Sequence, residues 1–258
     1  MIRLVFLLRR QPHLSLAEFQ AYWRDVHAPL VAKNATVLGV QRYVQVHALD
    51  EEMNERMNAQ RDGVMEPRYD GVAELWWESE EDLAAASATP EGRRAGAELL
   101  EDEGRFIDLP ASPLWLAHEY PQINPSPEVV ARERSSVVKL YYPLRHLPTL
   151  SFDEAQRYWR VQHGPKVRRH TPASGNLRYM QVHRFESPVE AALRAARGTT
   201  VEAYTGHAEA WIDRSIVRTN PEARAASALF VADERNFIDF ARSTMWIGKE
   251  HWIVDRYS

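Results

Sequence analysis

The sequence predicts an α+β protein built from two β-α-β-β-α-β units whose sheets pack face to face. The first observation is a repeat: LSLAEFQAYWRDVHAPLV, from Leu14, recurs as LSFDEAQRYWRVQHGPKV, from Leu150, with 10 of 18 positions identical. The second is that strand-like and helix-like segments follow in the same order in both copies. The chain is therefore a duplicated unit rather than one large domain.

Further matches run in the same order through both copies. They pair RYVQVH at Arg42 with RYMQVH at Arg178, GVAELW at Gly71 with GHAEAW at Gly206, and DEGRFID at Asp102 with DERNFID at Asp233. A proline-rich stretch with a charged end separates the copies and is typical of a linker. We predict a first unit over residues 1–121, a linker over 122–135 and a second unit over 136–258.

Each unit begins with a strand, over residues 2–9 or 137–142, and a helix that starts at Ser15 or Ser151. A glutamate three positions later completes a capping box in both copies. The RYVQVH or RYMQVH strand follows, and then a variable stretch rich in Glu and Arg. The later elements are a strand ending at Trp76 or Trp211, an Ala-rich helical region broken by Pro90 or Pro221, and a strand centred on Trp115 or Trp246.

This order is that of the ferredoxin-like unit, whose helices cover only one face of the sheet. Packing two such sheets together would bury the other face of each.

Composition excludes several classes of protein. The 258 residues contain no Cys, which excludes a disulfide scaffold, a zinc ribbon and a thiol nucleophile. A net charge of −4 without any Lys/Arg-rich run argues against a nucleic-acid partner. The apolar run Leu4–Leu8 is too short for a membrane span. We expect a soluble, cytoplasmic protein with no membrane partner.

Alternation along the second strand of each unit predicts which side chains share a face. We expect Val44 and Val46 to lie under the helices, and their opposite row to point between the two sheets. The predicted inter-sheet residues are Tyr43, Gln45 and His47 with Tyr179, Gln181 and His183, joined from the third strand by Glu74 and Trp76 with Glu209 and Trp211. These groups form either a hydrogen-bonded network between the units or an acid–base site with aromatic walls.

His27 and His163 are further candidates, because each precedes a helix-breaking X-Pro step and should lie near a helix C-terminus. There the imidazole either caps carbonyl groups or acts as an acid–base group. Tyr22 and Tyr158 lie on the same predicted helices. Each is either a structural residue or a substrate-binding residue. His207 stands where the first copy has Val72, so we expect the two half-sites to differ and one to dominate.

Motifs for nucleotide, phosphate or metal binding and for a serine nucleophile are missing, and the ten His residues show no tight metal spacing. We therefore expect neither a cofactor nor a metal.

The segments FQAYWRDVHAPL and AQRYWRVQHGPK resemble the EthD-like family of the dimeric α+β barrel superfamily. The resemblance covers nearly the whole chain and implies that two fused units build a barrel within one chain. Similar proteins are assigned cofactor-free dehydration, decarboxylation or cyclisation in aromatic polyketide pathways. The superfamily also includes muconolactone isomerases, cofactor-free monooxygenases and haem enzymes, so the fold alone selects no reaction.

Three hypotheses follow for function. The first is a cofactor-independent lyase or isomerase that acts on a small aromatic or polyketide-like molecule by His, Tyr and Glu acid–base chemistry. The second is a non-catalytic or stress-related protein that binds a hydrophobic ligand. The third is a haem-binding protein or a cofactor-free monooxygenase. Whether the fused chain forms a homodimer is left open.

Overall fold

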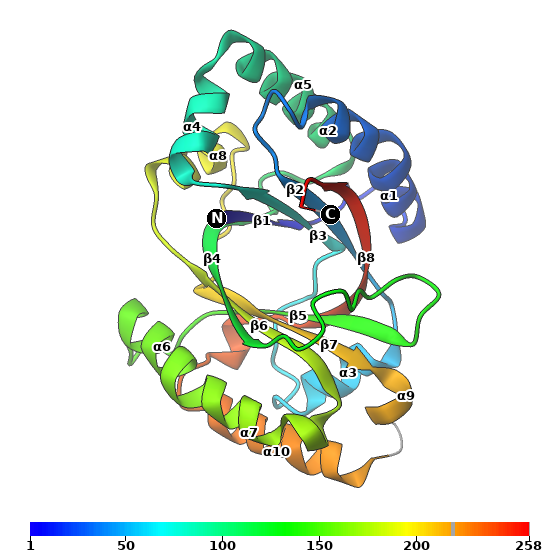
Figure 1. Cartoon of the computed structure of the whole chain (residues 1–258), viewed down its shortest axis with the longest axis vertical. Coiled ribbons are helices and arrows are strands. Elements are labelled where there is room, and N and C mark those ends of the chain that lie inside the picture. The colour runs from blue at the N-terminus through cyan, green and yellow to red at the C-terminus, as the bar shows by residue number, and fades with distance from the viewer. Residues whose placement is uncertain (218–219, 258) are drawn as a thin grey trace.

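Eight strands close into one antiparallel barrel with helices around the outside (Figure 1). The computed structural model describes residues 1–217 and 220–257. Around the barrel the strands follow the order β1-β3-β2-β8-β5-β7-β6-β4. The mixed α+β architecture and the single barrel built from two repeats are thus confirmed.

The first unit contributes β1 (Ile2–Leu8), β2 (Arg42–Ala48), β3 (Gly71–Trp77) and β4 (Leu114–Ile123), with α1 (Leu16–Tyr22), the π-helical turn η1 (Trp23–His27), α2 (Ala28–Asn34), α3 (Glu52–Ala59), α4 (Glu80–Ala88) and α5 (Pro90–Phe106). The second unit contributes β5 (Val137–Leu144), β6 (Asn176–Arg184), β7 (Gly206–Asp213) and β8 (Trp246–Asp255), with α6 (Phe152–Tyr158), the π-helical turn η2 (Trp159–His163), α7 (Gly164–Ser174), α8 (Pro188–Ala196), α9 (Arg214–Val217), α10 (Pro221–Glu234) and the 3₁₀ turn η3 (Phe240–Arg242). Among these helices, none has both the length and the hydropathy needed to span a bilayer.

The two units meet at two seams, where β2 pairs with β8 and β4 pairs with β6. Each unit alone would expose two unpaired edge strands, which invite pairing with other chains. Closing the barrel through these seams pairs every edge within the chain. β4 runs to Ile123 and so includes the first two residues of the predicted linker.

Local sequence signals act as expected at the start of the first helices but not at their ends. Both capping boxes form, Ser15 with Glu18 and Ser151 with Glu154. The prediction that a helix ends near each of these histidines, His27 and His163, was wrong. The chain instead continues through a π-helical turn into α2 or α7. The following proline lies in the first turn of the next helix, directly after the π-helical turn.

The prediction of which face of the second strand points into the barrel was wrong. Val44 and Val46 lie in the barrel interior, whereas Tyr43 packs in the cluster under the helices. The polar row fits there because the π-helical turn offers it partners: Gln45 Nε2 donates to the carbonyl of Trp23 at 2.9 Å. The small valines leave room for the large rings that fill the barrel. The second unit repeats this arrangement, with Val182 inside the barrel and Tyr179, Gln181 and His183 on the helix side.

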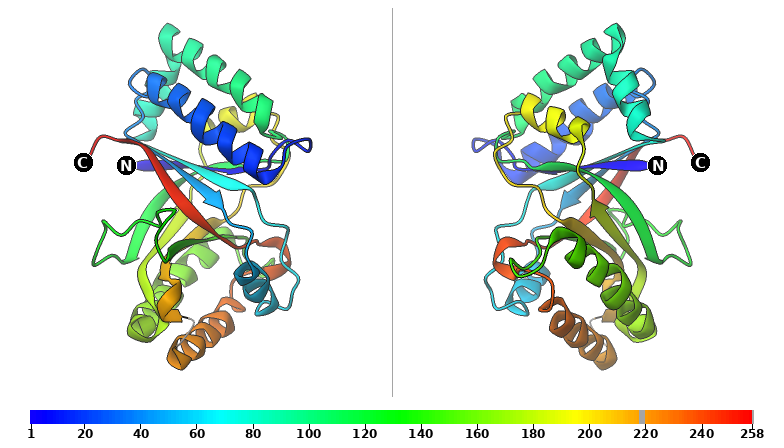
Figure 2. Two further views of the ribbon diagram at one scale, coloured as in Figure 1. Left: turned by 90° about the vertical axis from the view of Figure 1, so that its right-hand side faces the viewer. Right: turned by 90° about the vertical axis from the view of Figure 1, so that its left-hand side faces the viewer.

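Helices α3 and α8 cross between the units. Figures 1 and 2 show α3, from the first unit, among the helices of the second, and α8 among those of the first. Two bidentate ion pairs at equivalent positions join these crossing segments to the other unit. Arg61 pairs with Glu234 and Arg197 with Glu103, and each N···O distance is 2.8 Å. Each unit therefore completes the outer layer of the other.

Candidate functional site

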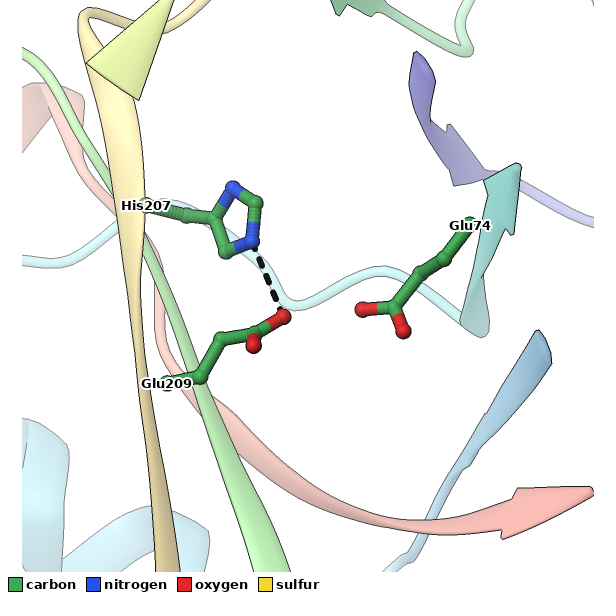
Figure 3. Close-up of side chains that lie close together, drawn as sticks. All are labelled: Glu74, His207 and Glu209. Carbon is green, nitrogen blue, oxygen red and sulfur yellow. Dashed lines mark hydrogen bonds and ion pairs between the residues drawn. The ribbon is translucent and has the colours of Figure 1, made fainter. Parts of the chain in front are cut away.

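Strands of both units bring charged side chains into the barrel interior. Arg3 of β1 and Lys139 of β5 occupy equivalent positions, and both contact Glu74 of β3 and Glu209 of β7. Lys139 Nζ lies 2.8 Å from Glu74 Oε1 and 3.0 Å from Glu209 Oε1, and these side chains are almost completely buried. His207 Nε2 lies 3.1 Å from Glu209 Oε1 (Figure 3).

Burial and pairing set the protonation of this cluster. Burial raises the pKa of Glu74 to about 8, because desolvation outweighs the attraction of Arg3 and Lys139. Burial also acts to raise the pKa of Glu209, but Arg3, Lys139 and His207 hold it well below its usual range. Burial lowers the pKa of His207 to about 3, so its ring is neutral at pH 7. One of the two facing carboxyl groups thus keeps its proton near neutral pH.

The same cluster contains a group of oxygen and nitrogen atoms that could hold a metal, from Glu74, His207 and Glu209, all within 4.8 Å of one another. Figure 3 shows Glu74 facing the other two from the opposite side of the barrel. Arg3 and Lys139 already pair with both carboxyl groups and Glu74 keeps its proton, so a divalent cation would have to displace that proton and a bound ammonium or guanidinium group. Large rings fill much of the remaining interior: Trp76, Trp115, Trp211 and Trp246. The barrel interior is therefore a packed ionic core.

The raised pKa of Glu74 predicts a pH dependence of stability. The native state holds this proton up to about pH 8, whereas the unfolded chain loses it near 4.5. The free energy of unfolding should therefore fall as the pH rises from 7 to 8 and level off by pH 9, where both states have lost the proton. Glu74→Gln, which mimics the protonated acid, should flatten the dependence of the melting temperature on pH in this range. An unchanged slope in this variant would contradict the assignment.

The helix-side rows form two equivalent networks around a tryptophan. In the first unit, Tyr43 Oη accepts a hydrogen bond from Trp23 Nε1 at 2.9 Å. His47 stacks on the indole ring of Trp23, with 4.7 Å between the ring centroids. In the second unit, His183 stacks on Trp159 at 4.4 Å. Burial is the main cause that lowers the pKa of His47 well below its usual value and that of His183 to about 3. Neither histidine is thus a ready base at neutral pH.

His27 and His163 each form a hydrogen-bonded group with an aspartate and a tyrosine. Their Nδ1 atoms lie 2.8 Å from Oδ2 of Asp102 and of Asp233. The hydroxyls of Tyr22 and Tyr158 donate to the other oxygen of the same aspartates, at 2.7 and 2.9 Å. Sequence reasoning missed both aspartates, although they lie in the repeated DEGRFID and DERNFID segments.

The second unit contains a cavity of about 810 Å³ between the outer face of its sheet and its helices. His163 and Tyr179 line it together with Trp159 and Tyr142. The first unit closes one side with residues of the α3 region: Glu51, Glu52, Met53, Arg56, Met57, Gln60 and Arg61. Two predicted site residues thus meet at a space large enough for a small molecule.

Side-chain size explains why this region is hollow in the second unit. Ala210 lines the cavity where the first unit has Leu75, and Ile212 lines it where the first unit has the buried Trp77. In the first unit, α4 also contributes the buried Leu83 to this region. The equivalent region of the first unit is a hydrophobic core cluster.

His163 and Tyr179 offer complementary hydrogen-bonding groups to the cavity. No residue within 1–217 or 220–257 hydrogen-bonds to Nε2 of His163. Because Asp233 accepts from Nδ1–H, the neutral ring carries its lone pair on Nε2. Tyr179 Oη accepts from Trp159 Nε1 at 3.2 Å and from Gln181 Nε2 at 3.3 Å, so its own proton is available for donation. Burial raises the pKa of Tyr179, which keeps that proton on the hydroxyl.

Asp233 is held as a carboxylate. Its partial burial acts to raise its pKa, but hydrogen bonds from His163, Lys166 and Tyr158 more than offset this and hold the pKa well below the usual range. Lys166 has no counterpart in the first unit, where Leu30 takes its place.

The fold and the site define a class of protein: a tandem α+β barrel with a His–Asp pair beside a small-molecule-sized cavity in one unit. The chain belongs to the EthD family, since the EthD domain matches residues 11–110 and 147–241. No curated protein matches the chain.

Solved structures resemble the chain at low sequence identity. A "putative monooxygenase" from Fusobacterium nucleatum is 7% identical with a TM-score of 0.52, over 96% of this chain and 91% of that one. Another from Lactobacillus acidophilus is 7% identical with a TM-score of 0.47, over 99% and 96%. An EthD family protein from Bacillus halodurans is 22% identical with a TM-score of 0.32, over 46% of this chain and 99% of that one. The Fusobacterium structure supports the fold alone.

Proposed function

We propose that the protein is a cofactor-independent lyase or isomerase that moves a proton on a small aromatic or polyketide-like molecule in the second-unit cavity. One observation carries the proposal: His163, whose Nε2 has no hydrogen-bond partner among the described residues, and Tyr179, whose hydroxyl proton is available, line the same cavity. The cavity on the helix side thus replaces the inter-sheet space as the proposed site. The strand order of each unit, fourth-first-third-second, supports the further proposal that the units are ferredoxin-like repeats.

The proposed step is removal of an acidic C–H proton next to a carbonyl group. His163 Nε2 takes the proton, and the C–H electron pair moves into the enolate as negative charge develops on the carbonyl oxygen. Tyr179 donates a hydrogen bond to that oxygen, which stabilises the charge. The imidazolium then returns its proton to another carbon or to a leaving group, which completes isomerisation or elimination.

Asp233 positions the base in this mechanism. Its carboxylate fixes the tautomer and orientation of the His163 ring and stabilises the imidazolium that forms. Tyr158 and Lys166 hold the carboxylate in turn. The aromatic rings of Trp159 and Phe230 supply apolar walls for a planar substrate.

The experiment that tests the function is deuterium exchange in D₂O on a panel of aryl ketones, followed by NMR. Catalysed exchange at the carbon next to the carbonyl supports the proposed proton transfer. Ligands that bind and are released unchanged, with no exchange across the panel, would favour a ligand-binding protein instead. Oxygen uptake with the same compounds would favour a cofactor-free monooxygenase.

Filling the cavity should weaken ligand binding without unfolding the protein. Ala210→Leu introduces the side chain of the first unit, and we expect the affinity for the neutral probe naphthalene-2-carboxamide to fall at least about tenfold. The free energy of unfolding should change by less than about 1 kcal/mol, because the new side chain enters empty space. Isothermal titration and urea unfolding measure the two effects.

The matched control is Leu75→Ala in the first unit. It should leave probe binding unchanged and lower the free energy of unfolding by about 2 kcal/mol, because it creates a void in a packed cluster. Equal binding losses in both variants would place the ligand elsewhere.

A further inference from the structure

We propose that the ligand of the second-unit cavity carries a carboxylate or similar planar oxyanion on its aromatic body, and that Arg224 binds this group. This inference rests on the proposed function, because it names the substrate class of the same cavity.

The charged residues that line the cavity are paired with one exception. Arg61 pairs with Glu234, Arg214 pairs with Glu51, and Arg56 lies 3.7 Å from Glu52. These pairs account for all three glutamates that line the cavity. Arg224, the fourth arginine of the lining, has no ion-pair or hydrogen-bond partner in the described part of the chain. Among the described residues, the cavity lining therefore has one uncompensated positive charge.

Arg224 lies where the cavity meets solvent. Its side chain is exposed, yet it also lines the cavity with Ala223, Ser227 and Phe230 of α10. The buried part of the lining is mainly apolar and includes Val167, Ala208 and Met245. A molecule with an apolar body and one anionic end matches this distribution, since the anion stays near water and pairs with a guanidinium fork suited to planar oxyanions.

The charge of the two units favours the same ligand. Residues 136–258 contain 18 Lys and Arg against 13 Asp and Glu, whereas residues 1–121 contain 12 against 21. The second unit is thus positive and the first strongly negative in sequence, and the half that contains the cavity stays the more positive although α3 brings Glu51 and Glu52 against it. Such a charge difference draws anions toward the second unit at low ionic strength.

The test compares naphthalene-2-carboxylate with its neutral isostere naphthalene-2-carboxamide by isothermal titration. We expect the wild type to bind the carboxylate about 5-fold more tightly, as for an exposed ion pair. Arg224→Gln should remove this preference and leave the affinity for the amide unchanged. Arg93→Gln, the equivalent position in the first unit, should keep the preference.

The outcomes separate this inference from the proposed function. If the amide binds but the carboxylate has no advantage, or if the advantage survives Arg224→Gln, the anionic ligand is ruled out while the cavity stands as a binding site. If neither probe binds, or if Ala210→Leu weakens neither, the cavity is not a ligand site and both proposals fall.

Discussion

Replacing Lys139 with methionine is expected to lower the free energy of unfolding by about 3–5 kcal/mol. The substitution keeps the volume of the side chain but removes an ammonium group buried between Glu74 and Glu209. Arg3 would remain in contact with both carboxyl groups, but Glu209 and Glu250, which lie 3.0 and 3.6 Å from Lys139 Nζ, would lose a buried cation. Urea unfolding at pH 7, monitored by tryptophan fluorescence, measures the effect.

Lys33→Met is the control for this experiment. Lys33 Nζ lies 3.1 Å from Glu98 Oε1, but its side chain is 67% exposed. An exposed pair of this kind contributes at most about 1 kcal/mol. If the two substitutions lower the free energy of unfolding by the same amount, the buried Lys139 contributes no more to stability than an exposed lysine does.

The second large effect is expected on proton transfer. His163→Gln removes the base and should slow catalysed deuterium exchange by about 10² to 10⁴-fold, the usual contribution of a general base. Binding of naphthalene-2-carboxamide should persist, because the cavity keeps its shape and most of its lining. NMR measures the exchange rate on a substrate that the wild type turns over.

His27→Gln provides a matched control within the same chain. His27 makes the same contact with an aspartate, at the same distance of 2.8 Å, but packs within a filled hydrophobic cluster. Its substitution should leave the exchange rate close to that of the wild type. Similar rate losses in both variants would show that the histidines support the fold rather than the reaction.

The repeat and the alternation of side chains predicted most of the architecture, including the inward direction of Glu74 and Trp76. Alternation divides a strand into two faces, but it does not say which face enters the barrel when both are buried. Gln45 illustrates this, because its partner on the helix side is the main-chain carbonyl of Trp23 in the π-helical turn.

The sequence pointed to residues that belong to the candidate site, but it did not predict where in the fold the site lies. His163 and Tyr179 were both named, but the cavity that joins them results from small side chains such as Ala210 and from a crossing helix of the other unit. A sequence pattern does not show where small side chains leave a cavity unfilled. Asp233 escaped notice because a lone aspartate in a helix has no distinctive spacing.

The divergence of the two units depends on their fusion. In a homodimer every substitution appears twice, so a subunit that opens a cavity opens two. Here one copy has leucine and tryptophan where the other has Ala210 and Ile212, and the fused chain, unlike a homodimer, allows both choices in one barrel. The expected stoichiometry is one ligand per chain, with the first unit serving as a scaffold that lends its α3 helix to the binding half.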